Sequence, residues 1–274
     1  MSAVANVERL PHVPGVGRVT QTRVAVSEWT KLWSVRSTRW SLFAAFLFTI
    51  GVAALACAVV SHHYPQMSPQ DKASFHPLEV NLAGVQLAQL ALGVLGVLII
   101  TAEYSTGMIR ASFTAVPKRL PVLWAKAGVF GFVTFALMLP AVLVAFFVGQ
   151  AILAGHNIDV GFTAPHVIRV LVGAALYLTV VGLFGLGLGG IVRNTAGGIA
   201  SFAAIMFVLP PLMNVLPTSW NNAASPYLPL QAGAAILSTT PGGHLSPWVG
   251  LALFAGYAAA AIAVAAVLLV RRDT

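Results

Sequence analysis

Charged side chains are scarce in this chain: they make up 8% of its 274 residues, whereas hydrophobic residues make up 58%. A soluble domain usually has about a quarter charged residues. Together with a mean hydropathy of +0.87, this scarcity excludes a soluble globular protein and indicates an integral membrane protein. We therefore take the net charge of +8 as a topology signal, and expect the lipid bilayer, not nucleic acid, as the chain's surroundings.

Cysteine and catalytic motifs are also lacking. Cys57 is the sole cysteine, so no internal disulfide can form. Its position in an apolar run predicts that its thiol is an ordinary buried side chain. The sequence has no Gly-x-x-x-x-Gly-Lys phosphate loop, no His-Glu-x-x-His and no Gly-x-Ser-x-Gly. We therefore expect no enzyme activity, ATP hydrolysis included, and no catalytic, cofactor-binding or metal-binding residues. Outer-loop histidines such as His62, His63 and His76 leave a metal site open, but their spacing favours solvated side chains.

Acidic residues number only 7, and we expect none of them in the middle of an apolar run. Proton- and ion-coupled transporters usually carry ionisable groups along their path through the membrane. This scarcity therefore disfavours a transporter that powers itself.

Six apolar runs remain, and each reaches the ~20 residues that a spanning helix needs. They lack the alternation of a barrel strand, so we predict an all-α integral membrane fold. The runs cover residues 40–61, 80–102, 127–153, 166–192, 195–216 and 248–270. Pro140 and the pair Pro210 and Pro211 should kink or break the third and fifth helices.

The basic residues predict the orientation of these helices. All but two of the 15 basic residues, Lys72 and Arg169, fall in segments on one side of the predicted membrane. That side should be the cytoplasm, so both termini are expected to be cytoplasmic in a multi-pass protein of the cell membrane.

Two segments outside the six runs have a predicted structure. Residues 1–39 form a cytosolic segment in which 19–39 reads as an amphipathic helix, because Val26, Trp29 and Trp33 recur at helical spacing. It would lie on the inner leaflet, or serve as a simple membrane anchor. Residues 228–237 are apolar but too short to span, which predicts a short re-entrant segment before the last helix.

Small and mildly polar residues form one stripe on the second run. Gln86, Gln89, Gly93 and Gly96 are spaced by three, four and three residues. Such a stripe lines a pathway or a subunit contact, or packs against another helix of the same chain.

A polar island separates the second and third runs. It comprises residues 103–110 (EYSTGMIR), residues 117–119 (PKR) and Lys126. Since so little of the chain is charged, this island is either a cytosolic contact surface for a partner or a positive anchor for the helices.

The whole pattern resembles the permease subunits of ABC-2 type ATP-binding-cassette exporters. The resemblance covers nearly the whole chain, and residues 40–274 would form the six-helix transmembrane domain. Many members have Gly-Thr where this chain has Gly107 and Met108. The motifs that carry the resemblance are residues 27–36 (SEWTKLWSVR), 103–110, 116–119 with Lys126, 191–197 (IVRNTAG) and 270–273 (VRRD).

The resemblance implies a separate ABC-type ATPase subunit, which would hold the ATP and Mg²⁺, and a second permease copy, identical or not. The loop between the second and third helices would dock on the ATPase as a coupling helix, through Glu103, Tyr104, Gly107 and Arg110. The second and fifth helices would line the pathway or the subunit contact, through Gln86, Gln89, Ser201, Phe202 and Met206.

We therefore expect the membrane subunit of an ATP-driven exporter for an amphipathic or hydrophobic substrate. The alternative is a membrane sensor or assembly subunit of an ATPase complex that transports nothing itself. Neither the substrate nor the direction of transport follows from the residues.

Overall fold

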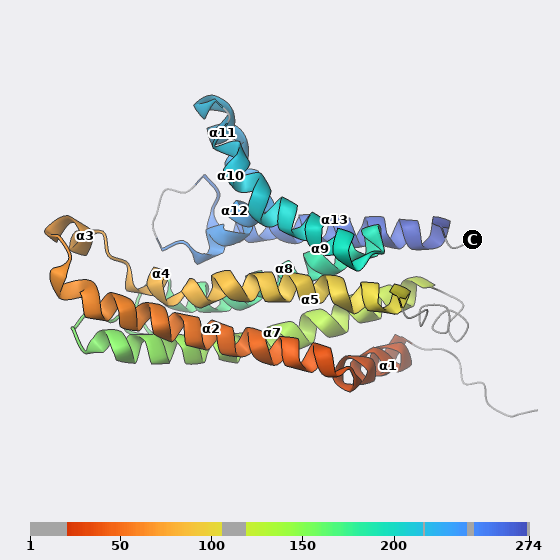
Figure 1. The fold of residues 1–274 in the computed structure, drawn as a ribbon, viewed down its shortest axis with the longest axis horizontal. Coiled ribbons are helices and arrows are strands. Elements are labelled where there is room, and N and C mark those ends of the chain that lie inside the picture. The colour runs from red at the N-terminus through yellow and green to blue at the C-terminus, as the bar shows by residue number, and fades with distance from the viewer. Residues whose placement is uncertain (1–20, 106–118, 216, 240–243, 273–274) are drawn as a thin grey trace, which may run out of the picture.

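The computed structural model describes residues 21–105, 119–215, 217–239 and 244–272, and within these ranges the chain is helical and contains no strand. Long helices run alongside one another, with short helices at one end (Figure 1). The elements are α1 Gln21–Ser34, α2 Arg36–His63, η1 Tyr64–Gln66, α3 Pro69–Ala73, α4 Pro77–Asn81, α5 Ala83–Ser105, α7 Arg119–Ala154, α8 Val167–Val192, α9 Thr195–Ala203, η2 Ala204–Val208, α10 Leu209–Met213, α11 Thr218–Ala224, η3 Ser225–Tyr227, α12 Pro229–Ala234, η4 Ala235–Leu237 and α13 Pro247–Arg272.

Six helical stretches among the described residues are long and apolar enough to cross a membrane. This confirms the predicted all-α class and the number of spans. The arrangement is compatible with a multi-pass membrane protein.

Each of these stretches differs from its predicted limits by at least one residue, and two of the differences have a clear physical reason. The third was expected over residues 127–153, but α7 begins at Arg119, because arginine and lysine are good helix formers that hydropathy alone excludes. The fifth was expected over residues 195–216, but it consists of α9, the π-helical turn η2 and α10, and ends at Met213. Pro140 lies inside α7 without ending it.

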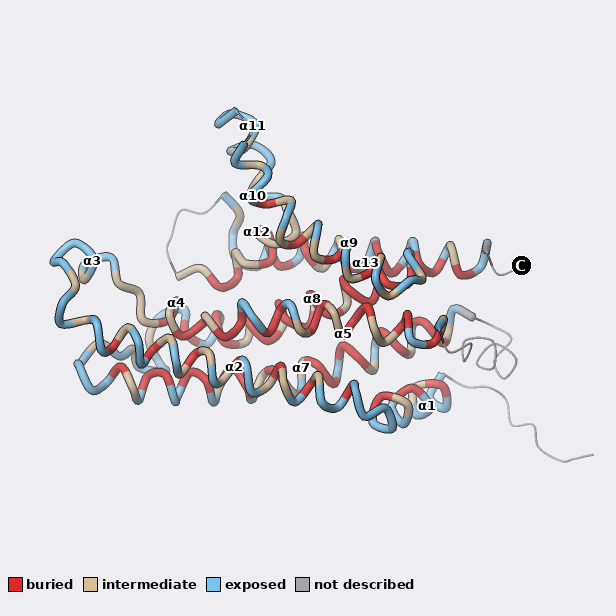
Figure 2. The backbone as a smooth tube through the Cα atoms, in the orientation of Figure 1, coloured by how far each residue is buried: buried red, intermediate tan, exposed pale blue. Residues whose placement is uncertain are grey.

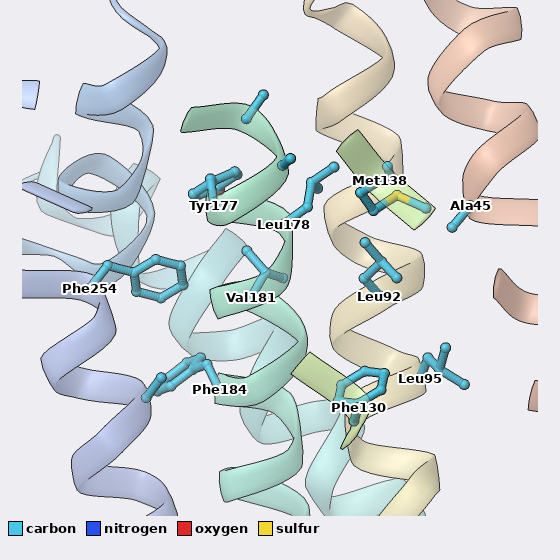
Figure 3. Packing of buried hydrophobic residues seen from close by; sticks show 14 of the residues in the cluster. Ala45, Leu92, Leu95, Phe130, Met138, Tyr177, Leu178, Val181, Phe184 and Phe254 are labelled. Carbon is cyan, nitrogen blue, oxygen red and sulfur yellow. The ribbon is translucent and has the colours of Figure 1, made fainter. Parts of the chain in front are cut away.

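The centre of the molecule is α8, which packs against α5, α7 and α13. Of the six stretches it is the most buried (Figure 2). Large apolar side chains fill its surroundings: Tyr177 and Phe184 of α8 both meet Phe254 of α13, with ring centroids 5.8 Å apart in each pair. On the other side, Leu92 of α5 and Phe130 of α7 are fully buried (Figure 3).

Glycines bring α5 and α8 unusually close. A Cβ atom added at Gly96 of α5 would overlap the carbonyl oxygen of Gly182, and one added at Gly185 would overlap the carbonyl oxygen of Gly93. At Gly189 it would lie 2.9 Å from the carbonyl oxygen of Val97. The stripe predicted on the second run therefore serves, in its Gly93 and Gly96 part, for helix packing within the chain.

One end of the bundle gathers elements that are distant in sequence. There, α1 lies close to the last turns of α5 and the first turns of α7, and α13 ends nearby (right in Figure 1). Both α5 and α7 border residues 106–118, which fall outside the described ranges.

Candidate functional site: an ion cluster between three helices

The amphipathic segment predicted over residues 19–39 contains α1, a break at Val35 and the start of α2. Val24, Glu28 and Leu32, spaced by four residues, form the buried face of α1, which packs mainly against α7. The tryptophans are on the outside: Trp29 is 41% exposed and Trp33 is 43% exposed. Helix α1 thus turns one face to the bundle and leaves an aromatic face uncovered in this chain.

Glu28 and Lys31 of α1, Glu103 of α5 and Lys126 of α7 form an ion cluster. Lys126 Nζ lies 2.5 Å from Glu28 Oε2 and 2.8 Å from Glu103 Oε1. Lys31 Nζ lies 2.7 Å from Glu28 Oε1 and 3.4 Å from Glu103 Oε1. Each carboxylate therefore receives both ammonium groups, and the cluster ties together three helices that are far apart in sequence.

The ion cluster is mostly withdrawn from solvent. The side chains of Glu28, Lys126 and Glu103 are 4%, 7% and 9% exposed, while Lys31, at the rim, keeps 28%. Two carboxylates balance two ammonium groups, so the cluster is neutral when all four are ionised. This balance matters because an uncompensated buried charge is costly.

The pKa of Lys31 is set by two opposing effects. Burial of its ammonium lowers the pKa, while the hydrogen bond to Glu28 and the charges of Glu103 and Glu28 raise it. The carboxylates outweigh the burial, and the pKa lies above its ordinary value of 10.5. Lys31 is therefore protonated throughout the physiological range and keeps its half of the charge balance.

The residues predicted to dock a partner ATPase have different surroundings. Glu103 is buried in the ion cluster, and Tyr104 packs on Arg193, whose guanidinium lies 5.1 Å from its ring centroid. Gly107 and Arg110 lie outside the described residues. In this structure Glu103 holds the end of α5 to α1 and α7, and it does not present its carboxylate at the surface.

A second set of contacts joins the same end of α5 to the helices that follow. Arg193 ends α8 in a left-handed conformation, with φ 57°, and donates to the carbonyl oxygen of Leu268 in α13 at 2.9 Å. Beside it, Thr195 of α9 donates to Thr101 of α5 at 3.0 Å. The last turns of α5 are thus linked to α9 and α13 as well as to α1 and α7.

The predicted pathway glutamines belong to a short polar chain. Gln89 is buried, accepts a hydrogen bond from the hydroxyl of Tyr177 and donates to Gln86 at 2.8 Å. Gln86 is exposed. The chain runs from an uncovered face of α5 to the core around α8.

The other predicted pathway residues lie where α9 meets α5. Phe202 is fully buried, and its ring occupies the space above Gly93, where a Cβ atom would overlap it. Met206, in the π-helical turn η2, is also fully buried. The hydroxyl of Ser201 donates to the carbonyl oxygen of Gly197 at 2.8 Å, so its hydrogen bond is made within α9. Phe202 of α9 therefore packs directly on Gly93 of α5.

No group of three or more potential metal ligands comes together in the part of the chain that the structure describes. Cys57 is fully buried and lies 3.8 Å from the Asn81 amide nitrogen.

Sequence reasoning missed the partners of Glu103. Lys31 and Lys126 were read as topology signals and as parts of the resemblance motifs, and Lys126 also as part of the polar island, but neither was paired with Glu103. Lys126 stands directly before an apolar run, where a lysine needs a partner or water. Glu28 and Lys31 are also spaced for an ion pair on one helix face. Tyr177, the partner of Gln89, looked like any other aromatic residue of a core helix.

Over the described residues, the fold and site define a helical protein with six stretches long and apolar enough to cross a membrane and a neutral ion cluster at one end of the bundle. The chain matches no protein-family model and no curated protein sequence.

Proposed function

We propose that the chain is the permease subunit of an ATP-driven exporter and works with a separate ATPase subunit. The observation that carries the proposal is the position of the ion cluster. It holds Glu103, near the end of α5, and Lys126, in the second turn of α7, to the same helix α1. These two helices flank the loop that would receive the ATPase, so a displacement of the loop would reach all three helices.

The proposed mechanism starts in the partner. ATP binding closes the ATPase dimer and displaces the docked loop, where Gly107 allows a close approach and Arg110 supplies charge. The ion cluster makes the ends of α5 and α7 move with α1. Since Phe202 of α9 rests on Gly93 of α5, a shift of α5 changes that contact and opens the pathway between the two helices.

The topology belongs to the same proposal. Both termini and the ion cluster face the cytoplasm, α1 lies in the inner headgroup layer with Trp29 and Trp33 toward lipid, and α12 and η4 form an outer re-entrant segment. A second permease copy covers the exposed apolar residues of the fifth span, such as Val208 and Leu212, which are 55% and 60% exposed.

The first experiment tests whether an ATPase binds the chain and whether the ion cluster couples ATP turnover by that ATPase to the membrane helices. The chain is tagged, extracted in mild detergent and reconstituted with the ATPase that accompanies it. Lys31→Gln is the test variant, because Lys31 lies at the rim of the cluster. Arg39→Gln is the matched control, because Arg39 is exposed and its substitution removes one positive charge from the same end of the molecule.

We expect both variants to bind the ATPase, and Lys31→Gln alone to lose several-fold in the permease-dependent ATP turnover of the complex. If no ATPase accompanies the chain, the exporter proposal fails. Equal turnover by the two variants would instead remove the ion cluster from the mechanism. A second assay measures ATP-dependent uptake of a fluorescent hydrophobic dye into inverted vesicles that contain the complex. An exporter supports this uptake, whereas a sensor subunit stimulates ATP turnover without it.

A further inference from the structure

A cavity of about 380 Å³ lies beside the ion cluster, between α1, α2, α5 and α7. It is lined by the four charged residues of the cluster and by Ser37, Thr38 and Ser41 of α2. The remaining lining residues are apolar and include Leu95, Leu98 and Val129. Its volume falls within the ~300–1,000 Å³ of ordinary ligand pockets, and its two-part lining matches an amphiphile.

Among the charged groups that line this cavity, Glu103 has an unused acceptor. Oε1 of Glu103 accepts from both Lys31 and Lys126. Oε2 of the same carboxylate takes part in no hydrogen bond or ion pair of the described residues, and it is not one of their fully buried atoms, although the side chain as a whole is only 9% exposed. A carboxylate oxygen that is still accessible can accept a hydrogen bond from a bound group. Since Glu103 lines the cavity, a bound headgroup would supply the donor.

The charge balance of the cluster restricts the kind of headgroup. Glu28 and Glu103 already compensate Lys31 and Lys126, so an added cation or anion would leave a net charge in a site sheltered from solvent. A neutral hydroxyl satisfies Oε2 and adds no charge. Longer apolar parts of such a molecule would lie along Leu95 and Leu98.

We propose that this cavity binds a net-neutral, hydroxyl-headed amphiphile, with the hydroxyl donating to Oε2 of Glu103 and the apolar chain against α5 and α7. The site is separate from the predicted pathway between α5 and α9. It requires no ATPase, so it stands or falls independently of the proposed export function.

Binding is tested by native mass spectrometry on the full chain in a neutral detergent, with three probes that share one alkyl chain length. 1-Lauroylglycerol carries hydroxyls, laurylamine carries a positive charge and laurate carries a negative charge. We expect 1-lauroylglycerol to bind about tenfold or more tightly than either charged probe, a difference that one poorly compensated charge readily produces. Equal binding of all three probes would overturn the proposal.

The cavity is then filled without changing any charge. Leu98→Trp places an indole in the cavity, and Leu90→Trp is the matched control on the same helix, at an exposed residue outside it. We expect Leu98→Trp to lose 1-lauroylglycerol binding and Leu90→Trp to keep it. Val129→Phe fills the cavity from α7 and gives the same test if Leu98→Trp does not fold. Retained binding in a folded, filled variant would contradict the proposal.

The natural ligand has two possible sources, which solvent extraction of the purified protein distinguishes. A neutral glycerolipid that is present in the wild type and depleted in Leu98→Trp identifies the surrounding bilayer as the source. A depleted hydroxyl-bearing amphiphile that is no membrane lipid identifies cargo. If no hydroxyl-headed molecule is depleted, the site does not bind one in the cell membrane.

Discussion

Lys126 is the residue on which the ion cluster depends most. It is buried, and of the two ammonium groups in the cluster only that of Lys126 lies within 3 Å of both carboxylates, whereas Lys31 approaches Glu103 only to 3.4 Å. Breaking a buried ion pair by removing one partner is strongly destabilising, because the other partner is left buried and uncompensated. Removing both partners of the pair is much less destabilising, because no uncompensated charge is left.

Replacement of Lys126 by methionine should therefore lower the free energy of unfolding by about 3–5 kcal/mol. The double variant Lys126→Met/Glu28→Met leaves Lys31 and Glu103 as a neutral pair and should recover much of that loss. Denaturation in detergent of the wild type, both single variants and the double variant measures the coupling. Additive losses would show that the two residues do not act as a pair.

Lys31 predicts a pH dependence with a definite sign. Its pKa in the folded protein is raised above 10.5 by Glu28 and Glu103. A raised pKa means that the stabilisation is fully present below the unfolded value and is lost as the pH rises through the folded one. The difference in melting temperature between wild type and Lys31→Gln should be constant from neutral pH to about 10 and shrink above it. A difference that grows with alkalinity would contradict this assignment.

For single residues, the sequence shows which residue is unusual but not which partners it has. Glu103 stands out because acidic residues are rare in the chain. Its partners Lys31 and Lys126 are 72 and 23 residues away, and no local spacing indicates that they meet. Only the packing of α1 across α5 and α7 brings the four charges together.

Among the elements, the pairing of α5 with α8 is set by glycine. The two backbones approach so closely that a single methyl group at Gly96 would overlap the carbonyl oxygen of Gly182. Neighbouring glycines on both helices repeat the arrangement, so the contact extends over several turns.

Gly96→Ala should therefore lower the melting temperature by several degrees, since a backbone or helix shift must make room for the new Cβ. Gly51→Ala on α2 is the matched control, because nothing lies within 4 Å of the added atom. That control should leave stability unchanged or raise it, as alanine is the better helix former by up to about 1 kcal/mol. Equal responses would show that the two helices are free to separate.

The helices themselves were largely predictable, whereas their interruptions were not. Hydropathy located all six spans because each needs a long apolar run. It missed the first turns of α7, which contain Arg119 and Lys126, because charge and helix propensity are independent properties. The π-helical turn Ala204–Val208 comes directly before Pro210 and Pro211, where an interruption was expected, but the sequence did not predict its π-helical form.

For the whole molecule, the single cysteine provides a direct test of topology. Cys57 is fully buried, so introduced cysteines can be labelled against a silent background. Asp71→Cys in α3 should react in intact cells with a membrane-impermeant maleimide. Arg271→Cys, at the end of α13, should react only after permeabilisation. Both positions are exposed, so labelling of both in intact cells would contradict the predicted orientation.

The ion cluster also has a consequence for how the chain is made. Glu28 and Lys31 leave the ribosome long before Glu103, and Lys126, which balances both carboxylates, follows 98 residues after Glu28. Lys126 is also 23 residues after Glu103, and until it is added Glu103 lies in water or beside Lys31 alone. A chain stalled before Lys126 would therefore carry one carboxylate, of Glu28 or Glu103, without a compensating charge. Membrane quality control could recognise such a chain by this unpaired acid.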